Sequence, residues 1–330
     1  MAGTVVPGLG IDAREAPDED ALRAALHGSD LVVVENACSL PLHPAAGTAI
    51  ARALRGRRAI LHHHDLPWQR PHLGPRPGWP PDDPAWLHVT INELSRLELA
   101  ERGIHAITVY NSFDTGAPPG RRDHARRLLG IAGHERLLLQ PTRAIRRKNI
   151  PAGVALANAL GAAYWLTGPA EDGYGQELAR ALAGCRQRVI QGIGGLDMRD
   201  AYAAADAVAF GSTWEGFGNP LIEAAIHRRP LAVGRYPVLN EIARLGFRWF
   251  GTDDPGPLRR WLDHPDQGLL EHNRRLADRH FSIRTLPRRL ASIMEDAGWL
   301  DLLARAGTTA AGVAAAVREP RAALGREVVV

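Results

Sequence analysis

The sequence predicts an α/β protein of the doubly wound class, built from parallel sheets in two domains. The chain has 330 residues, which is enough for two domains with hydrophobic cores of ordinary size. Short apolar, β-branched runs alternate with helical patterns, and such alternation is typical of parallel sheets that helices cover on both faces. A Gly/Pro-rich connector at 114–127 separates two sets of these runs, so the chain is expected to divide there.

The expected strands fall into these two sets. The first set is Leu31–Glu35, Ala59–His63, Trp86–Ile91 and Ala106–Tyr110. The second set is Arg136–Gln140, Ala163–Thr167, Arg188–Gln191, Ala207–Phe210, Pro230–Val233 and Arg248–Phe250. Helical patterns such as "DEDALRAALHG" lie between them, and several end at glycine, a common helix stop. The predicted domains are 1–114 and 115–285, and 286–330 is predicted to hold helices followed by a flexible tail.

The composition is that of a globular protein in a reducing compartment. The net charge of +4 is small, and the basic residues are spread along the chain without interleaved aromatics, which argues against nucleic-acid binding. No apolar run is long enough to span a membrane, and the opening "MAGTVVPGLG" does not read as a signal peptide. Cys38 and Cys185 lie far apart in unrelated contexts, so reduced thiols and a cytoplasmic location are expected.

The stretch "EGFGNPLIE", residues 215–223, is the first candidate for a ligand site. A buried strand precedes it, and Asn219 with Pro220 is a typical helix start, with Asn as the N-cap. The turn therefore joins the carboxyl end of a strand to a helix N-terminus, where backbone N–H groups and the helix dipole favour anions or sugar oxygens. Glu215 and Glu223 would repel a bare phosphate, so sugar or ribose hydroxyls suit them better. The alternative is that both acids merely flank a helix start.

The stretch "QPTRAIRRKNIP", residues 140–151, is the second candidate. Arg143 lies just past a strand, and Lys148 follows five residues later at the mouth of the next helix. Lys148 is the single lysine among 40 basic residues, which favours a role for a compact charge on a flexible stem. Two fixed cations beside a helix N-terminus suit a diphosphate leaving group. The alternative is a solvated basic loop, which also carries Arg146 and Arg147.

These motifs resemble the signature of retaining family 4 glycosyltransferases, of the glycosyl transferases group 1 class. The likeness rests on two glutamates separated by seven residues, with Gly-Phe-Gly after the first, and on the Arg…Lys spacing of "PTRAIRRKN". "HHHD" and "YNSFD" are similar to two first-domain motifs, although Ser112, Phe113 and Asn149 depart from the family pattern. "LVVVENACSLPL" resembles actinobacterial-type relatives, and the likeness covers roughly residues 30–300. It implies the GT-B fold, in which two Rossmann-like domains face a cleft.

The resemblance also implies an activity and roles for individual residues. It implies transfer of a sugar, with retention, from a nucleoside diphosphate sugar such as a GDP- or UDP-sugar to a small, lipid or glycan acceptor, without cofactor or metal. Same-face attack is the expected mechanism, and Glu215 as a nucleophile stays open. The implied catalytic residues are Glu215 at the transferred sugar, His64 at the donor sugar, and Arg143 and Lys148 at the diphosphate. The implied donor-binding residues are Glu223 at the ribose, Gly216, Phe217, Gly218 and Asn219 through their backbone, and Gly192 and Gly194 at the base. Alanine at Glu215 or Lys148 is expected to cripple transfer and leave the fold intact.

No metal site is expected from the sequence. Asp18, Glu19 and Asp20 open a helix, where acids complement the dipole. Successive strand residues point to opposite faces, so in the run "HHHD" only His62 and His64 could converge, and no companion Cys or His spacing is visible.

The proline-rich loop 67–84 is a candidate acceptor pocket. Its side chains for this role are Trp68, Gln69, Arg70, Arg76 and Trp79, because arginines suit a carboxylate or phosphate. An ordinary loop pinned by prolines is equally consistent with the sequence.

One departure from the GT-B pattern limits the functional prediction. The opening β–loop–α unit of the first domain has no counterpart before Leu31. A shortened first domain is therefore expected, with sheet edge and apolar surface exposed or covered by a partner or a second copy. Two other functions stay open: a non-catalytic GT-B remnant that binds nucleotide or serves as a partner subunit, and a GT-B nucleotide-sugar epimerase.

Overall fold

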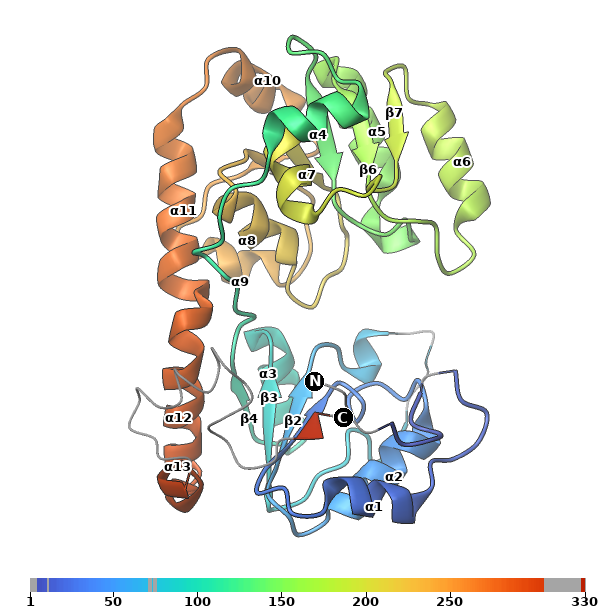
Figure 1. Cartoon of the computed structure of the whole chain (residues 1–330), viewed down its shortest axis with the longest axis vertical. Coiled ribbons are helices and arrows are strands. Elements are labelled where there is room, and N and C mark those ends of the chain that lie inside the picture. Colours follow the sequence, from blue (N-terminus) through green and yellow to red (C-terminus); the bar gives the residue numbers. More distant parts are fainter. Residues whose placement is uncertain (1–4, 11, 71–72, 74–75, 306–327, 330) are drawn as a thin grey trace. The chain divides into compact units, whose positions relative to one another are not determined.

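The structure is a computed structural model, and it describes residues 5–10, 12–70, 73, 76–305 and 328–329 (Figure 1). The chain forms two compact units, Met1–Asn111 with Arg284–Val330, and Ser112–Ile283. The helices after residue 284, which the sequence set apart as a third segment, therefore belong to the first unit. No helix in the described ranges is both long and apolar enough to cross a membrane.

The first unit contains a parallel sheet with the spatial order β11-β1-β2-β3-β4 (Figure 1). Its strands are β1 (Val32–Glu35), β2 (Ala59–His63), β3 (Trp86–Thr90), β4 (Ala106–Thr108) and β11 (Val328–Val329). Its helices are α1 (Glu19–Leu26), α2 (Pro44–Leu54), α3 (Glu93–Ala100), α12 (Leu286–Asp296) and α13 (Leu300–Arg305). The strand β11 pairs with Val32 and Val33 of β1, so a segment of the same chain lies along the edge that the sequence left open.

Helices cover both faces of this sheet, as the alternation of apolar residues predicts. Leu61 of β2 packs in one core with α1 and α2. Its neighbour Ile60 packs in another, with Met294 of α12 and with Trp299. Because successive strand residues point to opposite faces, the apolar run of β2 fills both cores at once.

The second unit contains a parallel sheet with the spatial order β10-β9-β8-β5-β6-β7. Its strands are β5 (Leu137–Gln140), β6 (Ala163–Leu166), β7 (Val189–Gln191), β8 (Ala207–Phe210), β9 (Leu231–Val233) and β10 (Phe250–Gly251). Its helices are α4 (Arg122–Leu129), α5 (Ile150–Leu160), α6 (Gly175–Ala183), α7 (Met198–Ala204), α8 (Asn219–Ile226), α9 (Leu239–Ala243), α10 (Pro255–Asp263) and α11 (Gln267–Phe281). The chain runs outward from β5 to β7 and returns to β8 on the other side of β5. The topological switch point therefore lies between β5 and β8, and open α/β sheets bind ligands at such a point.

The predicted α/β class with parallel sheets is confirmed, and every predicted strand is present within two residues of its expected ends. The Asp18 side chain caps α1 by accepting hydrogen bonds from the N–H groups of Asp20 and Ala21, so this acidic run is a helix start as expected. The predicted start of α8 is wrong by one residue, because Gly218 and not Asn219 is the N-cap. Most of the predicted flexible tail, 306–327 with 330, lies outside the described residues.

A line of polar side chains, buried except for the exposed Asp82 at its end, crosses the first sheet. The Asp82 carboxylate lies 3.0 Å from His88 Nε2, His88 Nδ1 lies 2.8 Å from His63 Nε2, and His63 Nδ1 lies 2.7 Å from the Ser39 hydroxyl. Burial lowers the pKa of His63 well below its usual value, and the nearby His88 lowers it further. Burial also lowers the pKa of His88, against the opposing effect of Asp82. Both imidazoles are therefore neutral in the folded protein.

We expect this line to make the first unit sensitive to acid. In the unfolded chain these histidines take up protons near pH 6.5, whereas the folded chain resists protonation. The contribution of these two neutral histidines to the free energy of unfolding is complete above about pH 6.5. It is lost as the pH falls toward their lower pKa values in the folded protein, at up to about 1.4 kcal/mol per pH unit for each group. His63→Gln should flatten the dependence of stability on pH between 5 and 6.5, as measured by calorimetric unfolding. Equal slopes in both proteins would contradict this account.

Candidate active site at the carboxyl edge of the second sheet

Two loops meet at the switch point of the second sheet. One follows β5 and ends in the 3₁₀ turn Arg146–Lys148, and the other follows β8 and leads into α8. The two strands are direct neighbours, with Leu138 opposite Ala207. A backbone hydrogen bond of 2.9 Å from the Thr213 N–H to the Arg147 carbonyl ties the loops together. The sheet therefore places the two sequence motifs side by side.

Glu215 is the centre of the charged cluster that these loops form. One carboxylate oxygen lies 2.5 Å from Lys148 Nζ, and the other lies 2.7 Å from Arg147 Nη1. The Glu215 side chain is 9 % exposed and that of Lys148 is 12 % exposed, so the pair is shielded from water. Arg147 also donates to the Trp214 carbonyl at 2.9 Å, which fixes its guanidinium against the loop. The structure thus brings Glu215 and Lys148 together, and it adds Arg147.

The surroundings of Lys148 weaken its hydration. Burial lowers the pKa of the Lys148 ammonium, and the Glu215 carboxylate acts in the opposite direction. Its Nζ also lies 5.4 Å from the centre of the Phe210 ring, within the range of a cation–π contact. A poorly hydrated cation interacts more strongly with an incoming anion than a solvated one does, because less water screens it.

Asn149 explains one departure from the family pattern. It has φ 49°, in the left-handed region, where glycine is the usual residue and asparagine is tolerated. The position therefore keeps the backbone geometry that the resemblance associates with glycine. It also lets α5 begin directly after Lys148, with the helix N-terminus at the carboxyl edge of the sheet.

Gly218 is required by packing inside the protein. It has φ 97°, and a Cβ atom there would lie 2.3 Å from the Tyr236 hydroxyl oxygen. That hydroxyl donates to the Phe217 carbonyl at 3.2 Å. At Gly218 the space beside the backbone is thus filled by a tyrosine that supports the loop.

Glu223 lies one turn into α8 and has a different partner from Glu215. It accepts a hydrogen bond of 2.6 Å from the hydroxyl of Tyr202, which is buried and stacks on His227. Burial raises the pKa of Glu223, and the Tyr202 hydrogen bond partly counteracts this. The two glutamates of the motif are therefore held by separate elements, Glu215 by the β5 loop and Glu223 by α7.

Three further predicted site residues lie elsewhere on the same edge. Arg143 is 56 % exposed and pairs with Glu171 at 2.6 Å, not with Glu215. Gly192 and Gly194 follow β7, with φ 80° and 59°, and the Gly192 carbonyl accepts a hydrogen bond of 2.7 Å from Trp165. Because β6 and β5 lie between β7 and β8, this glycine loop is at the same sheet edge but not in the Glu215 cluster.

His64 belongs to the first unit, at the carboxyl end of β2. Its Nε2 lies 3.1 Å from the Glu35 carboxylate, and His62 Nδ1 lies 2.8 Å from the same oxygen. The backbone N–H of His64 donates to the Asn36 side chain at 3.0 Å. His62 and His64 do converge, as the strand period predicts, and Glu35 joins them as a partner that no sequence signal indicated.

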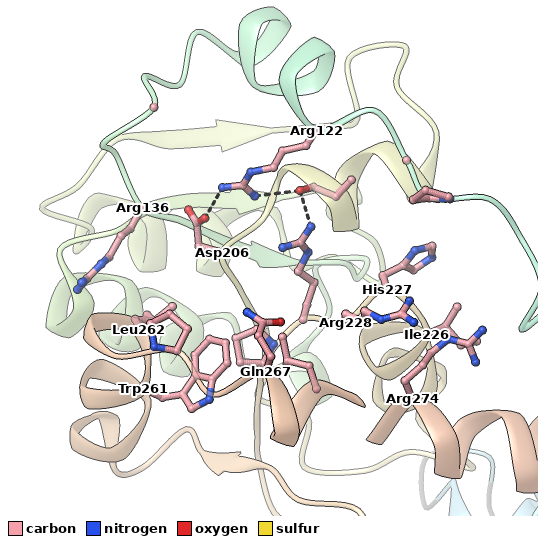
Figure 2. A pocket seen from close by; sticks show the side chains of 18 of the residues that line it. Arg122, Arg136, Asp206, Ile226, His227, Arg228, Trp261, Leu262, Gln267 and Arg274 are labelled. Atoms are coloured by element: carbon pink, nitrogen blue, oxygen red, sulfur yellow. Dashed lines mark hydrogen bonds and ion pairs between the residues drawn. The ribbon is translucent and has the colours of Figure 1, made fainter. Parts of the chain in front are cut away.

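A cavity of about 590 Å³ lies at the opposite, amino edge of the second sheet (Figure 2). Arg122, His227, Trp261 and Arg274 are among its lining residues. Arg122 donates to the carbonyls of residues 203–205 at the end of α7, and Figure 2 shows it reaching Asp206 as well. Cations stabilise helix C-termini, so this arginine has a structural role. Ligands of open α/β sheets bind at the carboxyl edge, and we therefore place the candidate site at Glu215.

A second cavity of about 590 Å³ lies in the first unit, at the proline-rich loop. Trp68, Arg70, Arg76 and Trp79 line it as expected, and Arg102 joins them with its guanidinium 3.7 Å from the Trp68 ring centre. Gln69 has other partners: it donates to Ser95 at 2.9 Å and to Glu98 at 2.6 Å.

Comparison with known proteins places these sites in context. Residues 148–255 match the family model of glycosyl transferases group 1. The mannosylglucosylglycerate synthase of Thermotoga maritima is 27 % identical, over 80 % of this chain and 76 % of that protein. The synthase of the same name from Petrotoga mobilis is 28 % identical, over 66 % of this chain and 62 % of that protein.

Solved structures with low sequence identity share the fold. Anabaena Alr3699/HepE, in complex with UDP-glucose, superposes with a TM-score of 0.66 at 19 % identity, over 84 % of this chain and 82 % of that one. Sucrose-phosphate synthase from Thermosynechococcus elongatus superposes with a TM-score of 0.64 at 16 % identity, over 84 % of this chain and 76 % of that one.

Proposed function

We propose that this chain, a glycosyltransferase of the GT-B fold with a glycosyl transferases group 1 domain at residues 148–255, transfers a hexosyl group from a nucleoside diphosphate sugar with retention. A UDP- or GDP-sugar is the proposed donor, and the diphosphate is neutralised by side chains without a metal ion. The observation that carries the proposal is the buried Glu215–Lys148–Arg147 cluster at the switch point of the second sheet.

The cluster suits the departure of a nucleoside diphosphate. Breaking the anomeric C–O bond builds negative charge on the leaving oxygen and positive charge on the sugar ring. Lys148 and Arg147 are fixed cations beside the N-terminus of α5, so they can stabilise the first charge without reorganisation. Arg143, at the same sheet edge, can exchange its exposed partner Glu171 for a phosphate oxygen. The departing phosphate then takes the proton of the attacking acceptor hydroxyl on the same face.

The acids of the motif suit the hydroxyl groups of the donor. A carboxylate only accepts hydrogen bonds, so Glu215 is proposed to bind hydroxyls of the transferred sugar while it stays paired with Lys148. Glu223 is proposed to accept from the ribose hydroxyls. Gly192 and Gly194 are proposed to lie at the base, and His64 is proposed to contact the donor sugar.

The acceptor is proposed to be a small sugar that carries a carboxylate. The cavity at the proline-rich loop combines tryptophan rings, on which sugars pack, with the guanidinium groups of Arg70, Arg76 and Arg102, which suit a carboxylate. The names of the two bacterial relatives, mannosylglucosylglycerate synthases, support an acceptor of this chemistry.

The direct test is a donor screen on the intact chain. UDP-, GDP- and ADP-sugars are compared by thermal shift, since a bound donor stabilises the folded state by mass action. The donors that bind are then incubated with glycosylated hydroxy acids, and the anomeric configuration of the product is read by NMR. We expect one nucleotide class to bind and its hexose to be transferred with retention. Binding without transfer or hydrolysis, or conversion of the donor without an acceptor, would overturn the proposal.

Donor affinity should depend on pH through Glu223. Because burial raises the pKa of this carboxyl, it loses its charge at a higher pH than an exposed glutamate, and the neutral form is a poorer acceptor for ribose hydroxyls. Affinity for UDP or GDP is therefore expected to fall as the pH drops through that raised value. Tyr202→Phe removes a donor to the carboxylate, so the fall should begin at a higher pH. Titration calorimetry between pH 5 and 8 measures this, with Tyr174→Phe in the same unit as the control. An unshifted profile in Tyr202→Phe would contradict the ribose assignment.

A further inference from the structure

We propose that the carboxyl edge of the first sheet binds a divalent transition-metal ion, Zn²⁺ in the first place, on Glu35, His62 and His64. The three residues come together through strand pairing. Glu35 ends β1 and stands opposite His62 of β2 in the parallel register. His64 follows two residues later, so its side chain returns to the same face as that of His62. This proposal shares His64 with the donor-sugar contact proposed above, and its test needs neither donor nor acceptor.

The ligand atoms already converge. One oxygen of Glu35 lies 2.8 Å from His62 Nδ1 and 3.1 Å from His64 Nε2, and the three ligand atoms lie within 4.8 Å of one another. The two imidazole rings meet edge to face, with an angle of 76° between their planes. Tetrahedral zinc, with ligands at about 2.0–2.2 Å, separates neighbouring ligand atoms by roughly 3.4 Å. The two contacts of Glu35 with the rings therefore need to open by about 0.3–0.6 Å, and the two ring nitrogens, which lie within 4.8 Å of each other, need to close toward the same separation, to admit the ion.

The chemistry of the three side chains favours zinc. Two imidazoles and one carboxylate form the ligand set of zinc sites that keep a fourth position for water or another molecule. The side chains of Glu35, His62 and His64 are 40 %, 22 % and 43 % exposed, so an ion can reach them from solvent. In the part of the chain that the structure describes, this is the group of His, Cys, Asp and Glu side chains with a metal-binding arrangement.

The competing account is a hydrogen-bonded cluster alone. In it each imidazole donates an N–H to the Glu35 carboxylate, and no ion is involved. The two accounts differ in the protonation of the ring nitrogens that point at Glu35. A nitrogen that binds a metal ion presents a lone pair, whereas a nitrogen that donates a hydrogen bond carries a proton. Metal titration of the folded chain separates them.

The experiment titrates the untagged, chelator-treated full chain with Co²⁺ at pH 7.5, followed by visible absorption, and with Zn²⁺, followed by calorimetry. We expect one ion per chain and the absorption bands of tetrahedral Co²⁺, which Zn²⁺ displaces. Glu35→Gln and His62→Asn each remove a direct ligand. The affinity for Zn²⁺ should therefore fall by more than the roughly 10–100-fold that is typical when a residue hydrogen-bonded to a ligand is removed. His105→Asn is the matched control, because His105 is an exposed histidine of the same unit away from the cluster.

Thermal unfolding without metal shows whether each variant is folded. Zn²⁺ should raise the melting temperature of the wild type and of His105→Asn, and it should leave that of Glu35→Gln and His62→Asn unchanged. Absence of saturable binding by the wild type overturns the proposal. Wild-type affinity in Glu35→Gln and His62→Asn overturns it as well, because the ion then lies elsewhere.

Discussion

Lys148→Met is expected to lower the rate of sugar transfer by a factor of roughly 10²–10³, with the fold preserved. The change removes a preorganised cation from the diphosphate site while keeping most of the side-chain volume. Glu215 keeps Arg147 as its partner at 2.7 Å, so no carboxylate is left buried and unpaired. The measurement is kcat and KM for the donor identified in the screen. A loss in kcat with little change in KM is expected, because the leaving group gains its charge in the transition state.

Arg146→Met is the matched control for Lys148→Met. Arg146 lies two residues away on the same 3₁₀ turn, is 72 % exposed, and pairs with Glu177. Exposed pairs of this kind contribute little, and the rate should stay within about a factor of three of the wild type. Similar rates in Lys148→Met and Arg146→Met would remove Lys148 from the mechanism.

Glu215→Ala is expected to lower transfer by a comparable factor and also to destabilise the second unit by about 3 kcal/mol. Removing the carboxylate leaves Lys148 and Arg147 as two neighbouring cations in a site where the lysine is only 12 % exposed. Loss of one member of a buried pair costs more than the pair contributes, because the remaining charge has no water to replace its partner. The sequence-based expectation that this variant leaves the fold intact is therefore revised for Glu215 and kept for Lys148.

A double-mutant cycle tests this explanation. If unpaired Lys148 causes the loss, then Glu215→Gln combined with Lys148→Met should be more stable than the sum of the single changes predicts, by about 1–3 kcal/mol. Urea unfolding of the second unit provides the measurement. Glu171→Gln is the control, since it removes a carboxylate from the exposed pair with Arg143 and should cost less than about 1 kcal/mol. Additive effects in the cycle would show that the two side chains do not stabilise each other.

The elements of this protein follow from local sequence, and the partners of its charged residues do not. The strands were predictable because buried parallel strands are continuous apolar runs, as in the Leu137–Gln140 segment. The roles of Arg147 and Glu35 were not predictable. Arg147 is one of four basic residues within six positions, and only the 3₁₀ turn decides that it faces Glu215 while Arg146 faces Glu177. Glu35 becomes a partner of His62 and His64 through the register of β1 on β2.

The α/β class, the two motifs at the ends of strands, and the residue types that suit a nucleoside diphosphate sugar could all be predicted from local sequence. Which of these residues act together depends on how the strands pair. The tertiary structure places Lys148 against Glu215, 67 positions away, because β5 and β8 are neighbours at the switch point. Arg143 pairs with Glu171 instead, and Glu223 accepts a hydrogen bond from Tyr202. Local propensity depends on a few consecutive residues, whereas electrostatic pairing depends on distances in space that only strand order and register define.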